Sequence, residues 1–387
     1  MPIVELPTGI TLSFESIGSP DDPTVLLIAG FGAQLLSWDE GMCEQLVERG
    51  LRVVRFDNRD CGQSTAFDDV EVDLGAVMTA ASTGQLEAAR QLAAYTLHDM
   101  ADDAAGLIEA LGLPSVHVVG ASMGGMVAQL VASRHTARVR SLTSMMSSTG
   151  ESHVGQSTPE AMAALLSPPA NSRDEFIETA VRSSRVWSSR RYFDESTAAE
   201  LAAASYDRSF RPAGTMRQLA ALLATGPLTD ELAALAVPTL VIHGRDDTLI
   251  TPSGGERTAE LVPGARLVMI EDMGHDRPPP LWPDLCDRIA DHGTRRKRGS
   301  RNRRPITARN RVATGPRRSS VRPWILAADA AGLLASSATV SLQWPTVGTG
   351  RRFCTGLTTW KAHASQRSPE VVHRRGRRRC DVRMHER

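Results

Sequence analysis

Ser122 stands in a segment whose residue types could make it a nucleophile. The stretch Gly120-Ala121-Ser122-Met123-Gly124 has the pattern G-x-S-x-G, follows the apolar run 116–119, and precedes residues with helical spacing. A sharp turn between a strand and a helix pushes the serine out above a sheet, and only small residues can flank it there. The sequence therefore predicts a nucleophilic serine. The plain structural alternative is a glycine-rich connection with a hydrogen-bonding serine.

A nucleophilic serine needs a base, and the base needs an acid that orients it. The apolar runs 237–244 and 266–270 predict two buried strands. Asp246 and Asp247 follow the first strand, and the loop after the second ends in His275. In open α/β sheets the carboxyl ends of the strands form the edge where ligands bind. One of the two aspartates and His275 could therefore complete a catalytic set with the serine, in the chain order serine, acid, histidine.

Two backbone N–H groups are expected to stabilise the oxyanion that such a serine would generate. One belongs to the residue after the nucleophile, Met123, and the other to a loop after an early strand. The run 24–28 predicts that strand, and the glycine-rich segment 29–32 follows it. We assign the second donor to Phe31, with a plain glycine turn as the alternative.

The remaining histidines are interpreted differently. His243 falls inside the predicted strand 237–244, so we expect a core residue or a partner of a neighbouring side chain. His98, His135 and His153 lack a place at a strand end.

Taken together, these segments resemble the α/β-hydrolase family over about residues 3–292. Among its subfamilies, the chain is most similar to the aclacinomycin methylesterase and lipase/esterase group. The residues that carry the resemblance lie at 28–32, 56–65 (the pattern D-x-R-x-x-G-x-S), 120–125, 244–247 and 274–275.

The resemblance implies an α/β-hydrolase fold, with a mostly parallel central sheet, helices on both faces and an inserted helical lid. It favours Asp247 as the acid, because Asp247 is the third residue after Gly244, while Asp246 stays the alternative. A serine nucleophile argues against the branches of this fold that use an aspartate.

The activity that the resemblance implies is hydrolysis of a small-molecule carboxylic ester through an acyl-enzyme. Ser122, Asp247 and His275 would form the triad, and no cofactor or metal is expected. An iminopeptidase-like or C–C bond hydrolase with the same triad is the alternative enzyme. A non-catalytic ligand-binding protein on the same fold is the alternative from another class.

The chain divides into four predicted parts. Residues 1–150 and 226–292 are the two halves of the hydrolase core, and the alanine-rich, helical segment 151–225 is the lid. The core begins with an antiparallel hairpin over 3–17, and further elements are expected as strands near 24–28, 52–56, 116–119 and 139–146, a helix that begins at Thr96, and a last helix near 282–292. Candidate acyl- or aryl-pocket residues in the lid, each with ordinary packing as its alternative, are Met162, Leu165, Trp187 and Tyr192.

The last segment, 293–387, has a different composition. It holds 23 basic and 4 acidic side chains, including both lysines of the chain, although the formal net charge of the whole chain is zero. Three interpretations are open: a nucleic-acid-binding extension, a polybasic tethering segment, and a frame-shifted read-through of GC-rich DNA. The abrupt change of composition at the end of the hydrolase-like segment favours the third. Binding to nucleic acid is not expected of the rest of the chain, and the basic tail is the one segment that could provide it.

Cysteine content and hydropathy bear on the compartment. The chain has 5 cysteines without a disulfide or metal-site spacing, which fits a reducing compartment. The N-terminus has no basic and apolar leader pattern, and no apolar run reaches the length of a membrane span. We therefore expect a cytoplasmic protein without a membrane span.

Overall fold

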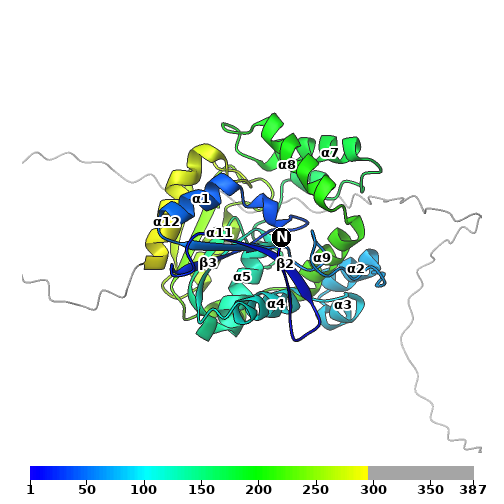
Figure 1. The fold of residues 1–387 in the computed structure, drawn as a ribbon. Helices are drawn as coiled ribbons and strands as arrows, with labels where there is room; N and C mark the ends of the chain where they lie inside the picture. The colour runs from blue at the N-terminus through cyan, green and yellow to red at the C-terminus, as the bar shows by residue number, and fades with distance from the viewer. Residues whose placement is uncertain (295–387) are drawn as a thin grey trace, which may run out of the picture. The chain divides into compact units, whose positions relative to one another are not determined.

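An eight-stranded sheet organises residues 1–294, the part of the chain that the computed structural model describes (Figure 1). The strands are β1 (Ile3–Glu5), β2 (Thr11–Ile17), β3 (Thr24–Ile28), β4 (Arg52–Phe56), β5 (Val116–Ala121), β6 (Val139–Met145), β7 (Thr239–Gly244) and β8 (Arg266–Ile270). Their order across the sheet is β1-β2-β4-β3-β5-β6-β7-β8. β2 runs antiparallel to β1 and β4, and all other neighbours are parallel. The predicted mostly parallel sheet with an N-terminal hairpin is confirmed.

Helices cover both faces of this sheet, and a further group of helices stands apart from it. They are α1 (Glu40–Glu48), α2 (Leu74–Ser82), α3 (Leu86–Leu92), α4 (Leu97–Ala110), α5 (Met123–Arg134), α6 (Pro159–Leu165), α7 (Arg173–Trp187), α8 (Glu195–Arg208), α9 (Pro212–Thr225), α10 (Thr229–Ala233), α11 (Ser253–Leu261) and α12 (Trp282–Thr294). Side chains of α1 and α12 share one apolar cluster, and side chains of α4 and α5 share another on the opposite face of the sheet.

The central strand β3 shows why a continuous apolar run becomes a strand covered on both faces. All five of its residues are buried. Val25 and Leu27 join the cluster of α1 and α12, whereas Leu26 and Ile28 join the cluster of α4 and α5. Because successive strand residues point to opposite faces, each layer of helices requires its own apolar set.

Helix α4 begins where the sequence predicts it. The Asp99 carboxylate accepts the backbone N–H of Thr96 at 2.7 Å, and the Thr96 side chain caps the helix in return. This capping box satisfies N–H groups that a helix start leaves without partners. The helix then buries an apolar stripe that includes Met100 and Leu107.

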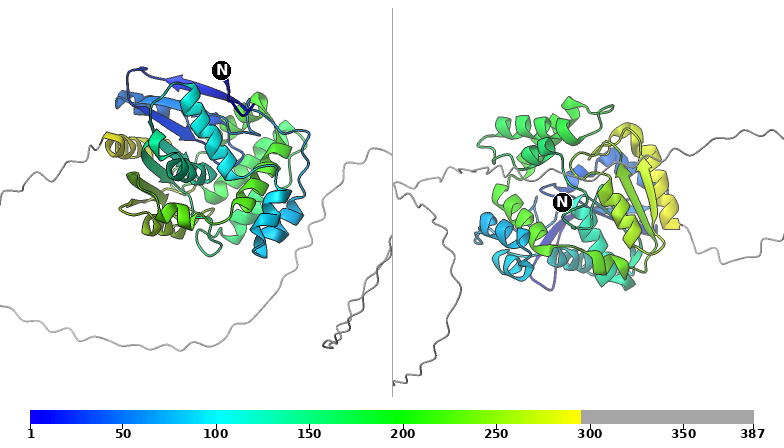
Figure 2. Two further views of the ribbon diagram at one scale, coloured as in Figure 1. Left: turned by 90° about the horizontal axis from the view of Figure 1, so that it is seen from below. Right: turned by 180° about the vertical axis from the view of Figure 1, so that it is seen from behind.

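The helical insertion between β6 and β7 contains α6 to α10. In Figures 1 and 2, α7 and α8 form a separate green layer at one edge of the molecule, whereas α9 lies beside α2 and α3. The sequence did not predict α2 and α3, which stand between β4 and α4 and share a small cluster of buried residues with α9. No helix within residues 1–294 is long and apolar enough to cross a membrane. Apart from its first two residues, the predicted basic tail 293–387 lies outside the described residues.

Candidate active site

Ser122 occupies the turn between β5 and α5. Its backbone has φ 58° and ψ −127°, a conformation that residues with a side chain rarely adopt, and strain of this kind clusters at functional sites. The Ser122 N–H donates to the carbonyl of Met145 at 3.0 Å, which ties the turn to the end of β6. The strand, the turn and the helix that the sequence predicts around Ser122 are all present.

The glycines beside the serine are required by packing. A Cβ on Gly120 would lie 2.0 Å from the carbonyl oxygen of Gly124, and a Cβ on Gly124 would lie 2.3 Å from the carbonyl oxygen of Ile28. These neighbours are backbone atoms that cannot rotate away. The G-x-S-x-G pattern therefore reflects close contact of α5 with β5 and with the end of β3.

Asp247 and His275 are brought together at the carboxyl ends of β7 and β8. The Nδ1 atom of His275 lies 2.8 Å from Oδ2 of Asp247, and the Asp247 side chain is fully buried. The other carboxylate oxygen, Oδ1, accepts the backbone N–H groups of Leu249 at 2.9 Å and Ile250 at 2.8 Å. Because Oδ2 can only accept from His275, Nδ1 carries the proton and Nε2 is left as an acceptor.

Asp246, the alternative acid, has a different environment. It is half-buried, and its carboxylate accepts no hydrogen bond from residues 1–294. Its backbone N–H donates to the carbonyl of Met273 at 3.0 Å. Of the two aspartates, the geometry pairs only Asp247 with His275.

His243 is a core residue beside the same acid, as the sequence suggested. It is fully buried, and its Nε2 lies 2.7 Å from the carbonyl oxygen of Ile250 and 3.5 Å from Oδ2 of Asp247. Burial lowers the pKa of His243, so the ring is neutral and Nε2–H donates to Ile250. His243 thus holds the loop whose N–H groups bind the Asp247 carboxylate. The other histidines lie elsewhere; His135, for example, pairs with Asp102 at 2.7 Å.

The glycine-rich loop after β3, residues 29–33, passes directly beside the serine. A Cβ on Gly30 would lie 3.2 Å from Cβ of Ser122 and 3.7 Å from its Oγ. Met123 is the first residue of α5, where helix geometry leaves the N–H group without an intrahelical acceptor. The N–H group of Phe31 also finds no acceptor within residues 1–294. Two free donors thus lie on the segments that flank Ser122.

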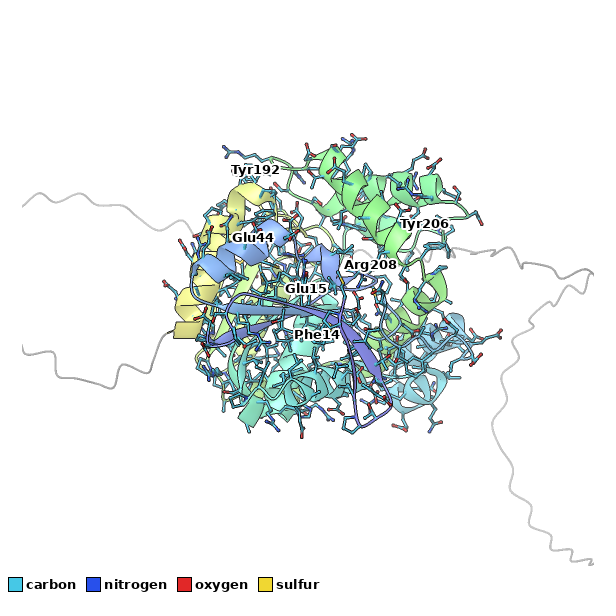
Figure 3. All side chains as sticks on the ribbon, viewed as in Figure 1. Phe14, Glu15, Glu44, Tyr192, Tyr206 and Arg208 are labelled. Atoms are coloured by element: carbon cyan, nitrogen blue, oxygen red, sulfur yellow. The ribbon has the colours of Figure 1, made fainter. Side chains whose placement is uncertain are left out.

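The D-x-R-x-x-G-x-S segment, residues 57–64, connects this loop region to the helical insertion. Oδ1 of the buried Asp57 accepts the N–H of Leu35 at 2.8 Å, and Oδ2 pairs with Arg208 of α8 at 2.7 Å. Arg208 also donates to the side chain of Gln34 at 2.6 Å, and Figure 3 shows it where α8 meets the core. Arg208 cannot be identified from the sequence, because nothing local to α8 indicates its partner.

The end of α7 contacts the loops of both the acid and the base. The His275 N–H donates to the Trp187 carbonyl at 2.6 Å, and the Thr248 hydroxyl donates to the Val186 carbonyl at 2.9 Å. Asp276 accepts the Ser189 N–H at 2.9 Å, and burial raises the pKa of Asp276. The carbonyls of Val186 and Trp187 belong to the last turn of α7, where they have no intrahelical partner.

The four candidate pocket residues differ in their position. Trp187 is half-buried and adjoins His275 through its carbonyl. Leu165 is half-buried, whereas Met162 is 42% exposed. Tyr192 lies at the outer edge of the insertion, where the Arg191 guanidinium stacks over its ring at 5.2 Å (Figure 3). Trp187 is therefore the member of this set that lies beside the candidate base.

The fold and this candidate site indicate the protein family to which the chain belongs. Residues 23–276 match the family described as the alpha/beta hydrolase fold, and the chain belongs to that family. Rhodomycin D methylesterase DauP of Streptomyces sp. strain C5 is 29% identical over 309 residues, which cover 73% of this chain and 95% of that protein. The resemblance to the methylesterase group is thereby confirmed.

Solved structures show the same fold. The esterase EaEST from Exiguobacterium antarcticum aligns with a TM-score of 0.58 at 20% identity, over 76% of this chain and 99% of that one. A thermophilic esterase from Thermogutta terrifontis aligns with a TM-score of 0.56 at 24% identity, over 76% of this chain and all of that one (100%). At these identities the likeness concerns the fold alone.

Proposed function

We propose that the protein is a serine hydrolase that cleaves a small-molecule carboxylic ester. The observation that carries the proposal is the contact between His275 and the buried Asp247, at the same sheet edge as Ser122. Asp247 holds the proton on Nδ1 of His275, so that Nε2 can accept a proton from a serine. A histidine in this state is what a serine nucleophile requires.

The proposed reaction has two halves. His275 takes the proton of the Ser122 hydroxyl while the oxygen attacks the ester carbonyl, and the N–H groups of Phe31 and Met123 stabilise the oxyanion. Each such donor contributes about 2.7–4 kcal/mol to the transition state. His275 then protonates the leaving alcohol, and water attacks the acyl-enzyme by the same route and releases the acid.

The relatives support an ester as the substrate. Two rhodomycin D methylesterases, from Streptomyces sp. strain C5 and Streptomyces peucetius, each match 73% of the chain. A methyl ester of a small molecule is therefore the substrate class that we propose. The helices of segment 151–225 would act as the lid that shapes the acyl and alcohol pockets. A cytoplasmic location stays a prediction from the sequence.

Replacement of Ser122 by alanine tests the proposal. We expect Ser122→Ala to lose turnover of p-nitrophenyl esters and to lose covalent labelling by a fluorophosphonate. Ser133→Ala serves as the matched control, because Ser133 lies on the same helix and its hydroxyl donates to the carbonyl of Leu130 at 3.1 Å. Turnover retained in Ser122→Ala, or a label found on another residue, would remove the proposed nucleophile.

A further inference from the structure

The loop 29–33 makes a tight turn whose orientation depends on a single peptide group. The Ala33 N–H donates to the Gly30 carbonyl at 3.2 Å, and Gly32 has φ 63°. Phe31 is not among the residues with positive φ, so the turn has the type II pattern, with Phe31 and Gly32 at its centre. Turns of types I and II differ by a flip of this central peptide. The orientation of the Phe31–Gly32 peptide therefore sets the shape of the turn that directly follows the Phe31 N–H.

Gln218 of α9 holds that peptide. Its Oε1 accepts the Gly32 N–H at 2.9 Å, and its Nε2 donates to the carbonyl of Arg59 at 2.8 Å. The Gln218 side chain is buried, with 1% of its surface exposed. Because both ends of the amide are engaged and no water competes for them, the side chain has one hydrogen-bonded orientation.

Helix α9 is itself fixed to the core beside this loop. Arg217 makes two hydrogen bonds of 2.8 Å to the carboxylate of Asp60, and both side chains are buried. Gly214 packs so closely on the Asp60 carbonyl that a Cβ there would lie 2.2 Å from the oxygen. Gln218 therefore projects from a helix that cannot shift relative to the segment around Asp60 without breaking a buried ion pair.

The other end of the loop is held separately. The Asn58 side chain donates to the Ala29 carbonyl at 3.0 Å. Asn58 thus fixes the start of the loop and Gln218 fixes its turn, while the Phe31 N–H between them is left free of acceptors within residues 1–294.

We propose that Gln218 is a positioning residue for the oxyanion donor of Phe31, so that a helix of the insertion takes part in catalysis without touching the substrate. This inference rests on the proposed function. Without the Gln218 acceptor, the Gly32 N–H would lose its partner on α9; because Gly32 itself is exposed, water could bind this N–H and the turn could leave its present position. The Phe31 N–H, which belongs to the preceding Gly30–Phe31 peptide, would move with the turn away from the position where oxyanion charge develops. The rate of the chemical step should fall, whereas substrate binding should change little.

The experiment compares two buried glutamines in the full-length chain, Gln218→Leu and Gln129→Leu. Gln129 is also 1% exposed, but its amide bonds to Ser144, away from the loop, at 3.0 Å. We expect Gln218→Leu to lose roughly 10- to 100-fold in kcat for p-nitrophenyl acetate, with little change in KM. The inhibition constant of a trifluoromethyl ketone, which binds as a tetrahedral oxyanion, should rise in parallel. Gln129→Leu should show neither effect.

Four measurements separate the outcomes. A kcat for Gln218→Leu equal to that of Gln129→Leu overturns the role of Gln218, and so does an unchanged inhibition constant. Failure of fluorophosphonate to label Ser122 in the wild-type protein refutes the proposed function instead. If Gln218→Leu does not fold, amide exchange of wild-type Gly32 decides the matter: slow exchange supports the hydrogen bond to Gln218, and exchange at the rate of an unbonded loop amide overturns it.

Discussion

Replacement of Asp247 by asparagine should inactivate the enzyme through the tautomer of His275. Oδ1 of Asp247 accepts two backbone N–H groups, from Leu249 at 2.9 Å and Ile250 at 2.8 Å, and Oδ2 accepts Nδ1–H of His275 at 2.8 Å. An asparagine can satisfy the two N–H groups only with its carbonyl oxygen, so its NH₂ group must face His275. An NH₂ group donates, which requires Nδ1 without a proton and places the proton on Nε2. The histidine would then have no acceptor for the Ser122 proton.

The size of the effect follows from this geometry. A triad histidine in the wrong tautomer loses about 10⁴-fold in kcat, which corresponds to about 5.4 kcal/mol. We expect Asp247→Asn to show this loss with p-nitrophenyl esters, and to keep nearly the wild-type melting temperature because both backbone hydrogen bonds remain. Asp246→Asn is the matched control and should keep the wild-type kcat. Equal losses in the two variants, or a loss confined to Asp246→Asn, would refute this assignment of the acid.

Three further predictions concern stability. Gly274→Ala would place a Cβ 2.4 Å from the carbonyl oxygen of Trp187, so it should lower the unfolding free energy in urea by about 1–3 kcal/mol and also reduce kcat. Arg217→Met leaves the buried Asp60 carboxylate without the cation that pairs with it and should cost about 3–5 kcal/mol in the same assay; a loss no larger than that of a surface substitution would contradict it. Burial lowers the pKa of His117 from 6.5 to about 4, so the folded state resists protonation and the protein should lose stability as the pH falls through that interval. His117→Gln should flatten this pH dependence of the unfolding free energy.

The sequence could predict the candidate site because each of its residues follows a local pattern. Ser122, Asp247 and His275 each come after an apolar run that ends in a polar or glycine-rich loop, and parallel strands bring such loops to one edge. The 2.8 Å contact between Asp247 and His275 agrees with that expectation. The choice between Asp246 and Asp247 was harder, because it depends on which carboxylate turns inward.

Contacts between segments that are distant along the chain have no local sequence pattern by which they could be predicted. Gln218 and Gly32 are 186 positions apart, and a glutamine in an alanine-rich helix looks like an ordinary surface residue. The same reason explains why α2 and α3 were not predicted. Their apolar residues are few and mostly small, and the buried members, Val77, Ala80 and Ala89, pack against Ala220 and Ala224 of α9. Tertiary packing rather than local periodicity stabilises such helices.

The attachments of the insertion bear on how a substrate could enter. The end of α7 bonds to the His275 loop, Arg208 at the end of α8 pairs with the buried Asp57, and α9 holds Asp60 and Gly32 through Arg217 and Gln218. A rigid-body opening of the whole insertion would break buried ion pairs. It would also displace the loops that carry the candidate base and the oxyanion donor. Such a motion would expose the candidate site but would also disrupt its geometry.

Access is therefore expected through the parts of the insertion that lack these attachments. The first turn of α7 is joined to α8 by the ion pair between Arg173 and Asp207 at 2.7 Å, with side chains 44% and 56% exposed. Exposed pairs of this kind contribute only about 0–1 kcal/mol, so this end depends mainly on the ring contacts of Phe176 with Tyr206 and Phe210, at 5.5 and 5.6 Å, and no buried ion pair has to break when it moves. An engineered disulfide between the start of α7 and the end of α8 should then slow the entry of bulky esters more than that of p-nitrophenyl acetate. Equal slowing of both substrates would instead indicate that the attached ends of the helices move.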